Sequence, residues 1–198
     1  MSTQAPYNPL EKVNLGISVA EAMLSQPVHR LDELKPFNGA GIYAIYYAGA
    51  HPAYEKLVNI NSTQGPTCPL YVGKAIPEGG RKGGGAIAGL KANTTKALFK
   101  RLGEHADSIR ATQLSVADFS CRYLVVDDIW IPLGESLLIA KFSPIWNLLV
   151  DGFGNHDPGS GRYNGLAPKW DVLHPGRAWA QKCKPRTETG AQITNEVS

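Results

Sequence analysis

The chain has few cysteines, no leader-like start and no long apolar run. Cys68, Cys121 and Cys183 are odd in number and far apart, which fits neither a disulfide framework nor a C-x-x-C zinc site. This usage favours a reducing compartment, and we expect a cytoplasmic protein. The first ten residues lack the basic and apolar regions of a signal peptide, so we expect none. No apolar run approaches the length of a membrane-spanning helix.

Charged residues are also scarce, at 19%, and the formal net charge is only +3. Together with 43% hydrophobic residues, this is the composition of a folded chain rather than a disordered one. A length of 198 residues favours one domain with decorated termini. The charge is unevenly spread, because eight lysines and arginines stand against three acidic residues between positions 74 and 110. Such a segment suits a polyanion such as nucleic acid, although a solvated surface is the simpler alternative.

Turn-forming residues divide the first half of the chain into short elements. Residues 1–10 predict a loose arm, and 15–24 predict a short helix that ends before a proline. Turn residues at 35–39 introduce a first strand. The polar stretch 51–69 predicts a long hairpin-type insertion, and the glycine-rich stretch 76–89 predicts a loop.

Hydrophobic periodicity is clearer in the second half of the chain. Apolar residues at helical spacing predict a helix over 91–111, and alternation predicts a strand over 118–127. A second helix is expected over 131–142, with a proline in its first turn. Beyond it the sequence predicts loops with one short helical stretch at 178–182 and a solvated tail over 184–198.

Two short motifs in strand-like surroundings carry the strongest chemical signal. Gly-Ile-Tyr ends at Tyr43 within a β-rich run, and Tyr-Val-Gly begins at Tyr71 within a short apolar run. Pairing of the two strands would bring these phenols close together. Tyrosine in a strand is most often packing, so neither motif alone indicates function. A phenol with a pKa of ~10 needs a nearby cation or metal to act as a base at neutral pH, and Lys74 and Arg101 are candidates.

Polar residues downstream complete an ordered set. Arg101 and His105 lie four residues apart and share one helix face. A lone histidine at the edge of a core is usually structural, but a cation one turn away favours a functional one. Glu135 shares a face with apolar residues, where an unpaired carboxylate would be costly. A helix cap, a basic partner or a metal ion would each explain it. Asn147 by itself suits a turn.

A competing motif is weaker. Residues 83–88 match a relaxed G-x-G-x-x-A dinucleotide loop, but no clear strand leads into them. The acidic residue that should follow, Asp107, falls inside a predicted helix. A nucleotide-binding oxidoreductase is therefore a distant alternative.

The ordered set resembles the GIY-YIG nuclease superfamily in its sequence of Gly-Ile-Tyr, Tyr-Val-Gly-Lys, Arg-x-x-x-His, Glu and Asn. That family usually places fewer residues between the tyrosine motifs than the twenty-seven between Tyr43 and Tyr71. Many members also carry a tyrosine where His105 stands. Both departures occur in the Type II restriction endonucleases of this fold that cut the palindrome CCGCGG. The similarity to that subgroup extends into residues 150–180, so it covers most of the chain.

The resemblance implies an α+β fold with a small central antiparallel β-sheet flanked by helices, inserted loops and a loop-rich C-terminal extension. It divides the chain into an N-terminal arm and helix at 1–35, a GIY-YIG catalytic core at 36–150 with insertions at 48–69 and 76–96, a DNA-recognition or structural extension at 151–183, and a polar tail at 184–198.

The activity that the resemblance implies is Mg²⁺-dependent hydrolysis of double-stranded DNA, which leaves 5′-phosphate and 3′-hydroxyl ends; Mn²⁺ would substitute for Mg²⁺. Glu135 would hold one ion, and Arg101 would neutralise charge on the phosphate. Tyr43 is the first choice to take a proton from the attacking water, with Tyr71 and His105 orienting it. Which tyrosine is the base stays open at this point. Lys74 would lower the pKa of the phenol that acts as the base. Asn147 would position the scissile phosphate or Glu135.

DNA recognition would use a second set of residues. Bidentate arginine suits the guanines of a G·C-only target in the major groove. The candidates for base contacts are Arg122, Asn155, His156, Arg162 and Arg177. Phosphate contacts are expected from the basic segment, at Arg81, Lys82, Lys91, Lys96 and Lys100.

A palindrome has two equivalent scissile bonds, whereas this chain has one site. We therefore expect a homodimer at least when bound to DNA, and a companion DNA methyltransferase in the host cell. A structure-specific or homing nuclease is an alternative, but those usually append a zinc finger or a separate DNA-binding domain. A catalytically silent DNA-binding module is the alternative from another class.

Overall fold

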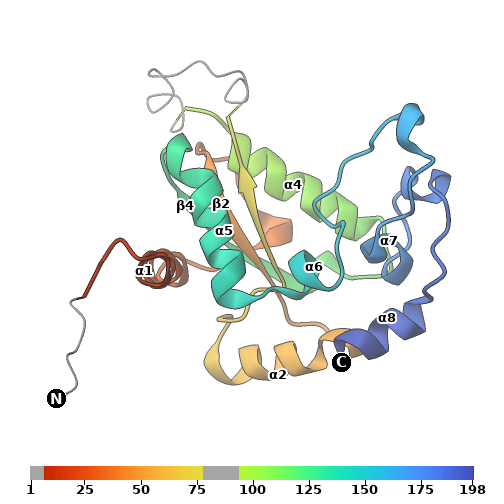
Figure 1. The fold of residues 1–198 in the computed structure, drawn as a ribbon, viewed down its shortest axis with the longest axis horizontal. Coiled ribbons are helices and arrows are strands. Elements are labelled where there is room, and N and C mark those ends of the chain that lie inside the picture. Colours follow the sequence, from red (N-terminus) through yellow and green to blue (C-terminus); the bar gives the residue numbers. More distant parts are fainter. Residues whose placement is uncertain (1–6, 78–93) are drawn as a thin grey trace.

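The computed structural model describes residues 7–77 and 94–198 and has an α+β fold. Its four-stranded antiparallel sheet has the order β1-β4-β2-β3 (Figure 1). The strands are β1 (His29–Arg30), β2 (Gly41–Tyr47), β3 (Tyr71–Ala75) and β4 (Phe119–Val125). The predicted fold class, with a small antiparallel sheet flanked by helices, is confirmed.

Strand β2 is the centre of the molecule, and all seven of its residues are buried. Because successive side chains of a strand point to opposite faces, β2 contributes to two cores. Tyr43, Ile45 and Tyr47 pack in one cluster, whereas Ile42 and Tyr46 pack in the other. An uninterrupted apolar run in an antiparallel sheet therefore reflects helices on both faces.

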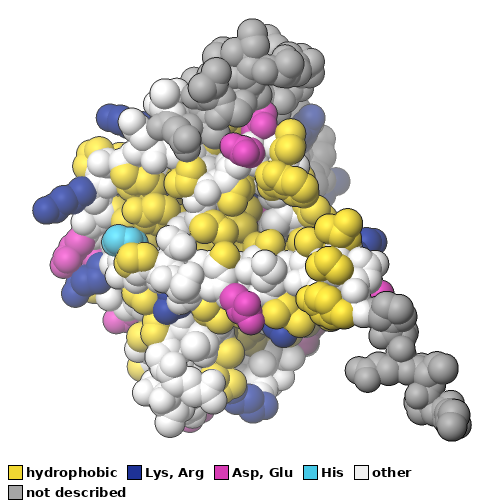
Figure 2. All heavy atoms as spheres, turned by 90° about the vertical axis from the view of Figure 1, so that its left-hand side faces the viewer, with side chains coloured by type: hydrophobic (Ala, Val, Ile, Leu, Met, Phe, Trp, Pro, Cys, Tyr) yellow, Lys and Arg dark blue, Asp and Glu magenta, His cyan; other side chains and the backbone are white. Residues whose placement is uncertain are grey.

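Different helices cover the two faces (Figure 1). Helix α4 (Ala97–Arg110) contributes Leu98, Leu102 and Ile109 to the cluster of Tyr43. Helices α1 (Lys12–Leu24) and α5 (Ile131–Phe142) contribute to the cluster of Ile42 and pack against each other. Hydrophobic side chains gather on the side of the molecule that carries α1 (Figure 2). Exposed apolar residues of the described chain include Ile129 and Trp130, which directly precede α5. No helix in the described part of the chain is long and apolar enough to cross a membrane.

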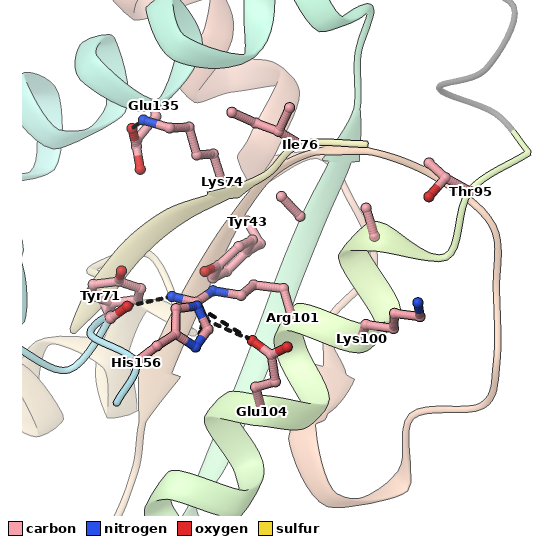
Figure 3. A pocket seen from close by; sticks show the side chains of 13 residues that line it. Tyr43, Tyr71, Lys74, Ile76, Thr95, Lys100, Arg101, Glu104, Glu135 and His156 are labelled. Atoms are coloured by element: carbon pink, nitrogen blue, oxygen red, sulfur yellow. Dashed lines mark hydrogen bonds and ion pairs between the residues drawn. The ribbon is translucent and has the colours of Figure 1, made fainter. Parts of the chain in front are cut away.

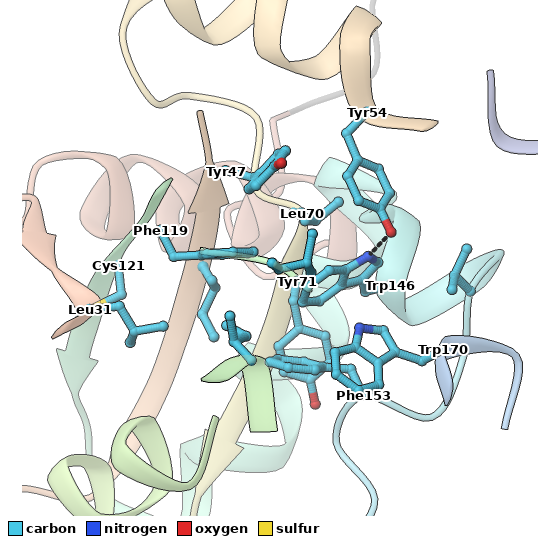
Figure 4. Packing of buried hydrophobic residues seen from close by; sticks show 14 of the residues in the cluster. Leu31, Tyr47, Tyr54, Leu70, Tyr71, Phe119, Cys121, Trp146, Phe153 and Trp170 are labelled. Atoms are coloured by element: carbon cyan, nitrogen blue, oxygen red, sulfur yellow. Dashed lines mark hydrogen bonds between the residues drawn. The ribbon is translucent and has the colours of Figure 1, made fainter. Parts of the chain in front are cut away.

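The C-terminal extension packs on the α4 side of the sheet through aromatic rings (Figure 4). Trp146, Phe153 and Trp170 are fully buried, with ring centroids 4.4 to 5.6 Å apart. Three short helices lie in this part of the chain, namely α6 (Ile145–Leu148) just before the extension, α7 (Lys169–Leu173) within it and α8 (Gly190–Val197) in the tail. The extension is therefore a structural part of the core.

The sequence did not predict the short elements β1, α6 and α7, and it also missed two longer helices. The insertion between β2 and β3 does connect a hairpin, but it contains the helix α2 (Glu55–Gln64). Only Leu57 of α2 is buried, so the sequence has almost no apolar stripe from which the helix could be predicted. The expected solvated tail ends in α8, where a capping box between Thr189 and Gln192 and the burial of Ile193 order the chain.

Smaller differences concern element boundaries. Helix α1 begins three residues earlier than expected, and α4 begins six residues later. The helical stretch near 178–182 is a 3₁₀ turn. The glycine-rich loop predicted at 76–89 lies mostly outside the described residues. The 3₁₀ turns of the described chain are Leu31–Glu33, Pro52–Tyr54, Val116–Asp118, Asp128–Trp130, Ser160–Arg162 and Ala180–Lys182.

Candidate active site

A cleft of about 400 Å³ opens between β3, the start of α4, α5 and the segment that follows α6 (Figure 3). Five of the seven residues implied as catalytic line it, and they come from four different elements. These five are Tyr43, Tyr71, Lys74, Arg101 and Glu135. The other lining residues are Ala75, Ile76, Thr95, Ala97, Lys100, Glu104, Gly154 and His156.

The register of β2 and β3 brings the two motif tyrosines together. Tyr43 lies opposite Gly73, and Ile45 lies opposite Tyr71, so the tyrosines are diagonal neighbours on one face. Their ring centroids are 6.2 Å apart, which confirms the prediction from strand pairing. A Cβ atom at Gly73 would lie 2.4 Å from the Tyr43 hydroxyl. Glycine at this position is therefore required for the phenol to lie across β3.

His105 lies beneath the cleft and is hydrogen-bonded to Tyr43. The Tyr43 hydroxyl is 2.6 Å from His105 Nε2, and both side chains are buried. Burial, helped by the charge of Arg101, holds the pKa of His105 well below its usual value, so the imidazole is neutral. Burial also raises the pKa of Tyr43 well above 10, with Tyr71 adding to the effect. Arg101 acts in the opposite direction and lowers this pKa, whereas Lys74, the cation expected to do so, forms an ion pair with Glu135.

Arg101 lies one helical turn before His105 and points into the cleft (Figure 3). Its Nη2 donates to the carbonyl of Gly154 at 2.5 Å. Its Nη1 contacts Glu104 Oε2 at 2.8 Å and His156 Nε2 at 2.6 Å. The guanidinium is thus held from two sides, with its charge directed toward the tyrosines.

Glu135 forms an ion pair with Lys74 across the cleft. Because Glu135 lies in the second turn of α5, it does not cap the helix, and a basic partner accounts for its position. No cluster of three or more metal-ligating side chains exists in residues 7–77 and 94–198. A single carboxylate fits Mg²⁺, which is commonly bound by one or two carboxylates together with water and substrate phosphate.

Asn147 has a different place from the one expected. Its side-chain oxygen accepts from the backbone N–H of Val72, and its amide donates to the carbonyl of Val72, both at 2.8 Å. Asn147 therefore holds the outer edge of β3 and contacts neither the cleft nor Glu135. Its role is to brace the strand that carries Tyr71 and Lys74.

Two residues expected to read bases are buried instead. Arg122 donates to the carbonyls of Gln26 and Pro66. Arg177 donates to Asp171 and to three backbone carbonyls of the extension. Both side chains are less than one-tenth exposed. Their donors are used inside the protein, because each position has acceptors from segments far apart in the sequence, so we no longer assign them to DNA.

The remaining DNA-contact candidates lie at the surface or outside the described residues. Lys96 and Lys100 are exposed at the start of α4, beside the cleft. A second hollow shares His156 with the cleft and is also lined by Asn155 and Arg162. Arg81, Lys82 and Lys91 fall outside the residues that the structure describes.

Two residues at the cleft were missed by sequence reasoning. Glu104 pairs with Arg101, and its position three residues later on the same helix was a readable signal. Gly154 borders Tyr71 so closely that a Cβ atom would lie 2.4 Å from the phenol oxygen. No local pattern indicates that contact, because the two residues are far apart in the sequence.

Comparison with known proteins agrees with this geometry. The model of one family, described as the Eco29kI GIY-YIG domain, matches residues 35–198. The match includes every residue that lines the cleft. Comparison with curated protein sequences gave no match.

Proposed function

Because the chain belongs to the Eco29kI GIY-YIG domain family and is a nuclease, we propose that it is a Type II restriction endonuclease. It hydrolyses double-stranded DNA at CCGCGG and leaves 5′-phosphate and 3′-hydroxyl ends. The observation that carries the proposal is the cleft itself. It brings together a hydrogen-bonded tyrosine–histidine pair, an arginine held from two sides and one carboxylate.

The Tyr43–His105 pair supports a proton relay. A phenolate at Tyr43 is disfavoured by burial, so the phenol needs somewhere to pass its own proton. Neutral His105 offers Nε2 at 2.6 Å as that acceptor. Tyr43 accepts the proton of the attacking water as it gives its own to His105, and Tyr71 beside it orients the water.

The charged residues act on the phosphate. Arg101 stabilises negative charge on the non-bridging oxygens, and its bonds to the Gly154 carbonyl and His156 hold it in place beforehand. Glu135 would hold one Mg²⁺, which when bound would polarise the phosphate and stabilise the leaving oxygen. Lys74 compensates the Glu135 carboxylate without the ion.

Recognition and partners follow from the same proposal. Lys96 and Lys100 contact phosphates, and Asn155, His156 and Arg162, which lie at the surface, contact base edges. Two copies act on each palindrome, in a cytoplasm that also contains a protecting methyltransferase.

The test is digestion of a sequenced plasmid with one CCGCGG site, with Mg²⁺ and with EDTA. We expect one Mg²⁺-dependent cut for the wild type and none for Glu135→Gln. The matched control is Glu196→Gln, because Glu196 also pairs with a lysine, Lys169, but lies on α8 away from the cleft. This variant should cut like the wild type.

Other outcomes change the proposal in defined ways. Discrete cuts at another sequence would keep the nuclease and replace the recognition site. Cutting confined to branched or flapped DNA would favour a structure-specific nuclease. DNA binding without cleavage of any substrate would reject the enzyme and leave a silent binding module.

A further inference from the structure

The guanidinium of Arg177 holds the chain segment that borders the catalytic cleft. Its Nη2 donates to the carbonyl of Gly152 at 2.9 Å. Its Nη1 donates to the carbonyls of Phe153 and Asn155, each at 3.1 Å. The one carbonyl between them, that of Gly154, accepts from Arg101 instead. The four successive carbonyls of residues 152–155 are thus bound by two arginines, Arg177 and the cleft residue Arg101.

Arg177 is itself fixed from three directions. Its Nε donates to Asp171 Oδ1 at 2.7 Å, and Nη2 donates to the other oxygen of the same carboxylate. The guanidinium lies over the rings of Trp170 and Trp179, at 4.5 and 4.7 Å from their centroids. Arg177 and Asp171 are both more than nine-tenths buried. The guanidinium is therefore a rigid anchor.

The segment held by Arg177 touches the catalytic groups directly. The ring of Phe153 stacks on His105 at 4.4 Å with an interplanar angle of 20°. The Gly154 carbonyl and the His156 ring both hold Arg101. Gly154 packs against the Tyr71 phenol so tightly that no side chain would fit. A shift of the segment would therefore move Arg101, His105 or Tyr71.

We propose that Arg177 is a positioning residue for phosphodiester hydrolysis, acting through residues 152–156 on Arg101 and His105. The inference rests on the proposed function. Arg177 does not line the cleft, so its loss should slow the chemical step more than it weakens DNA binding, to which Asn155 and His156 of the held segment also contribute under the proposed function. A small misplacement of groups that stabilise the transition state is costly, by up to about a hundredfold for ~1 Å.

The experiment uses Arg177→Lys in the full chain. Lysine keeps a positive charge beside Asp171 but replaces the planar fork by a point charge, so it cannot bind both the carboxylate and three carbonyls. The matched control is Arg186→Lys, since Arg186 also joins a carboxylate to a backbone carbonyl of the extension but lies away from the cleft. Three quantities are compared, namely the single-turnover cleavage rate with Mg²⁺, the DNA Kd in EDTA, and hydrogen exchange at residues 150–157.

We expect Arg177→Lys to exchange faster at 150–157 and to cleave roughly ten- to a hundredfold more slowly. Its DNA Kd should rise by a much smaller factor than the loss of rate, because only Asn155 and His156 of the loosened segment are assigned to DNA bases. Arg186→Lys should match the wild type in all three. An unchanged rate in Arg177→Lys despite faster exchange would overturn the positioning role. So would a loss of rate shared equally by Arg186→Lys, or one fully explained by weaker DNA binding.

If Arg177→Lys does not fold, the double variant Arg177→Met, Asp171→Leu replaces it. This variant removes both charges at once, so neither is left buried and unpaired, and such replacements often preserve stability. It is judged by the same three quantities. Cleavage by the wild type distinguishes failure of the proposed function from failure of the positioning role of Arg177. If the wild type does not cleave DNA, both proposals fail. If the wild type cleaves and the Arg177 variant cleaves equally fast, only the positioning role is rejected.

Discussion

Two buried tyrosine–histidine pairs in this protein have the same hydrogen bond and different surroundings. Tyr43 bonds to His105 Nε2 at 2.6 Å, and Tyr54 bonds to His174 Nε2 at 2.5 Å. The second phenol also accepts from Trp146 Nε1 at 2.7 Å (Figure 4), so its oxygen is fully used inside the core. The first phenol borders the cleft.

This difference shows which surroundings distinguish a tyrosine–histidine pair that could relay a proton from one that only packs in the core. Burial depresses the pKa of both histidines and raises the pKa of both phenols. The direction of the pKa shifts therefore does not distinguish the two pairs. Contact with the cleft and the neighbouring charge of Arg101 do, and both belong to the Tyr43–His105 pair only.

Removing the hydroxyl from each of the two pairs in turn should have its largest effect on the rate of DNA cleavage. Tyr43→Phe removes the hydroxyl that accepts and passes the proton, so the single-turnover rate should fall about a hundredfold or more. Tyr54→Phe should leave the rate unchanged and lower the free energy of unfolding instead. It leaves Trp146 Nε1 and His174 Nε2 without their partner, at about 1–3 kcal/mol for each buried group.

Both outcomes can be measured on the same preparations, by single-turnover cleavage and urea unfolding. Equal loss of cleavage in the two variants would reject the distinction between the pairs.

The next largest effect is on stability as a function of pH. The folded-state pKa of His174 is lowered to about 3 by burial, and that of His105 lies well below 6.5. The unfolded chain thus binds more protons below pH ~6.5. Stability from both histidines is present above that pH and is lost as the pH falls below it, at about 1.4 kcal/mol per pH unit for each; for His174 the loss continues to about pH 3.

Urea unfolding between pH 6.5 and 5 checks this slope. His174→Gln should remove its own contribution to the slope and leave cleavage intact. His105→Gln should remove its contribution and slow cleavage, and the remaining slope includes that of His51, whose pKa is also lowered by burial. If neither variant changes the slope, the histidines are not buried in their neutral forms.

The smallest effect concerns Glu104, a charged residue next to Arg101 that has no counterpart beside the Tyr54–His174 pair among the described residues. Glu104 is half exposed and pairs with Arg101, so under the proposed function we expect it to compete with DNA phosphate for the guanidinium. Glu104→Gln should tighten DNA binding in EDTA by about two- to fivefold, as expected for a surface ion pair. Asp107→Asn is the control, since Asp107 pairs with Arg110 at the same i,i+3 spacing, away from the cleft. Weaker binding of Glu104→Gln would show that the carboxylate supports Arg101 rather than competing.

The sequence predicts the parts of the site that depend on local spacing. Strand alternation places Tyr43 and Tyr71 on one face, and the i,i+4 spacing places Arg101 above His105. Contacts between distant segments were not predictable in the same way. Arg177 reads as a surface cation until the fold brings Asp171 and three carbonyls around it.

The two longer helices that the sequence did not predict, α2 and α8, were missed for different reasons. Helix α2 buries only Leu57, so its sequence has the polarity of a loop. Helix α8 was readable, because Thr189 and Gln192 have the spacing of a capping box just before Ile193. Its preceding lysines and its position at the chain end concealed it.

The bracing of β3 by Asn147 also affects how copies of the chain can associate. β3 is the last strand of the sheet, and an open edge can take up a strand from another molecule. Here the outward N–H and carbonyl of Val72 are taken by the Asn147 amide, and the carbonyl of Leu70 is taken by the backbone of Trp146. The Asn147 side chain and the Trp146 backbone thus occupy the positions that a fifth strand would use at Leu70 and Val72. Pairing with a strand of another chain is thereby blocked along this part of β3, while Tyr71 on the same strand lines the cleft.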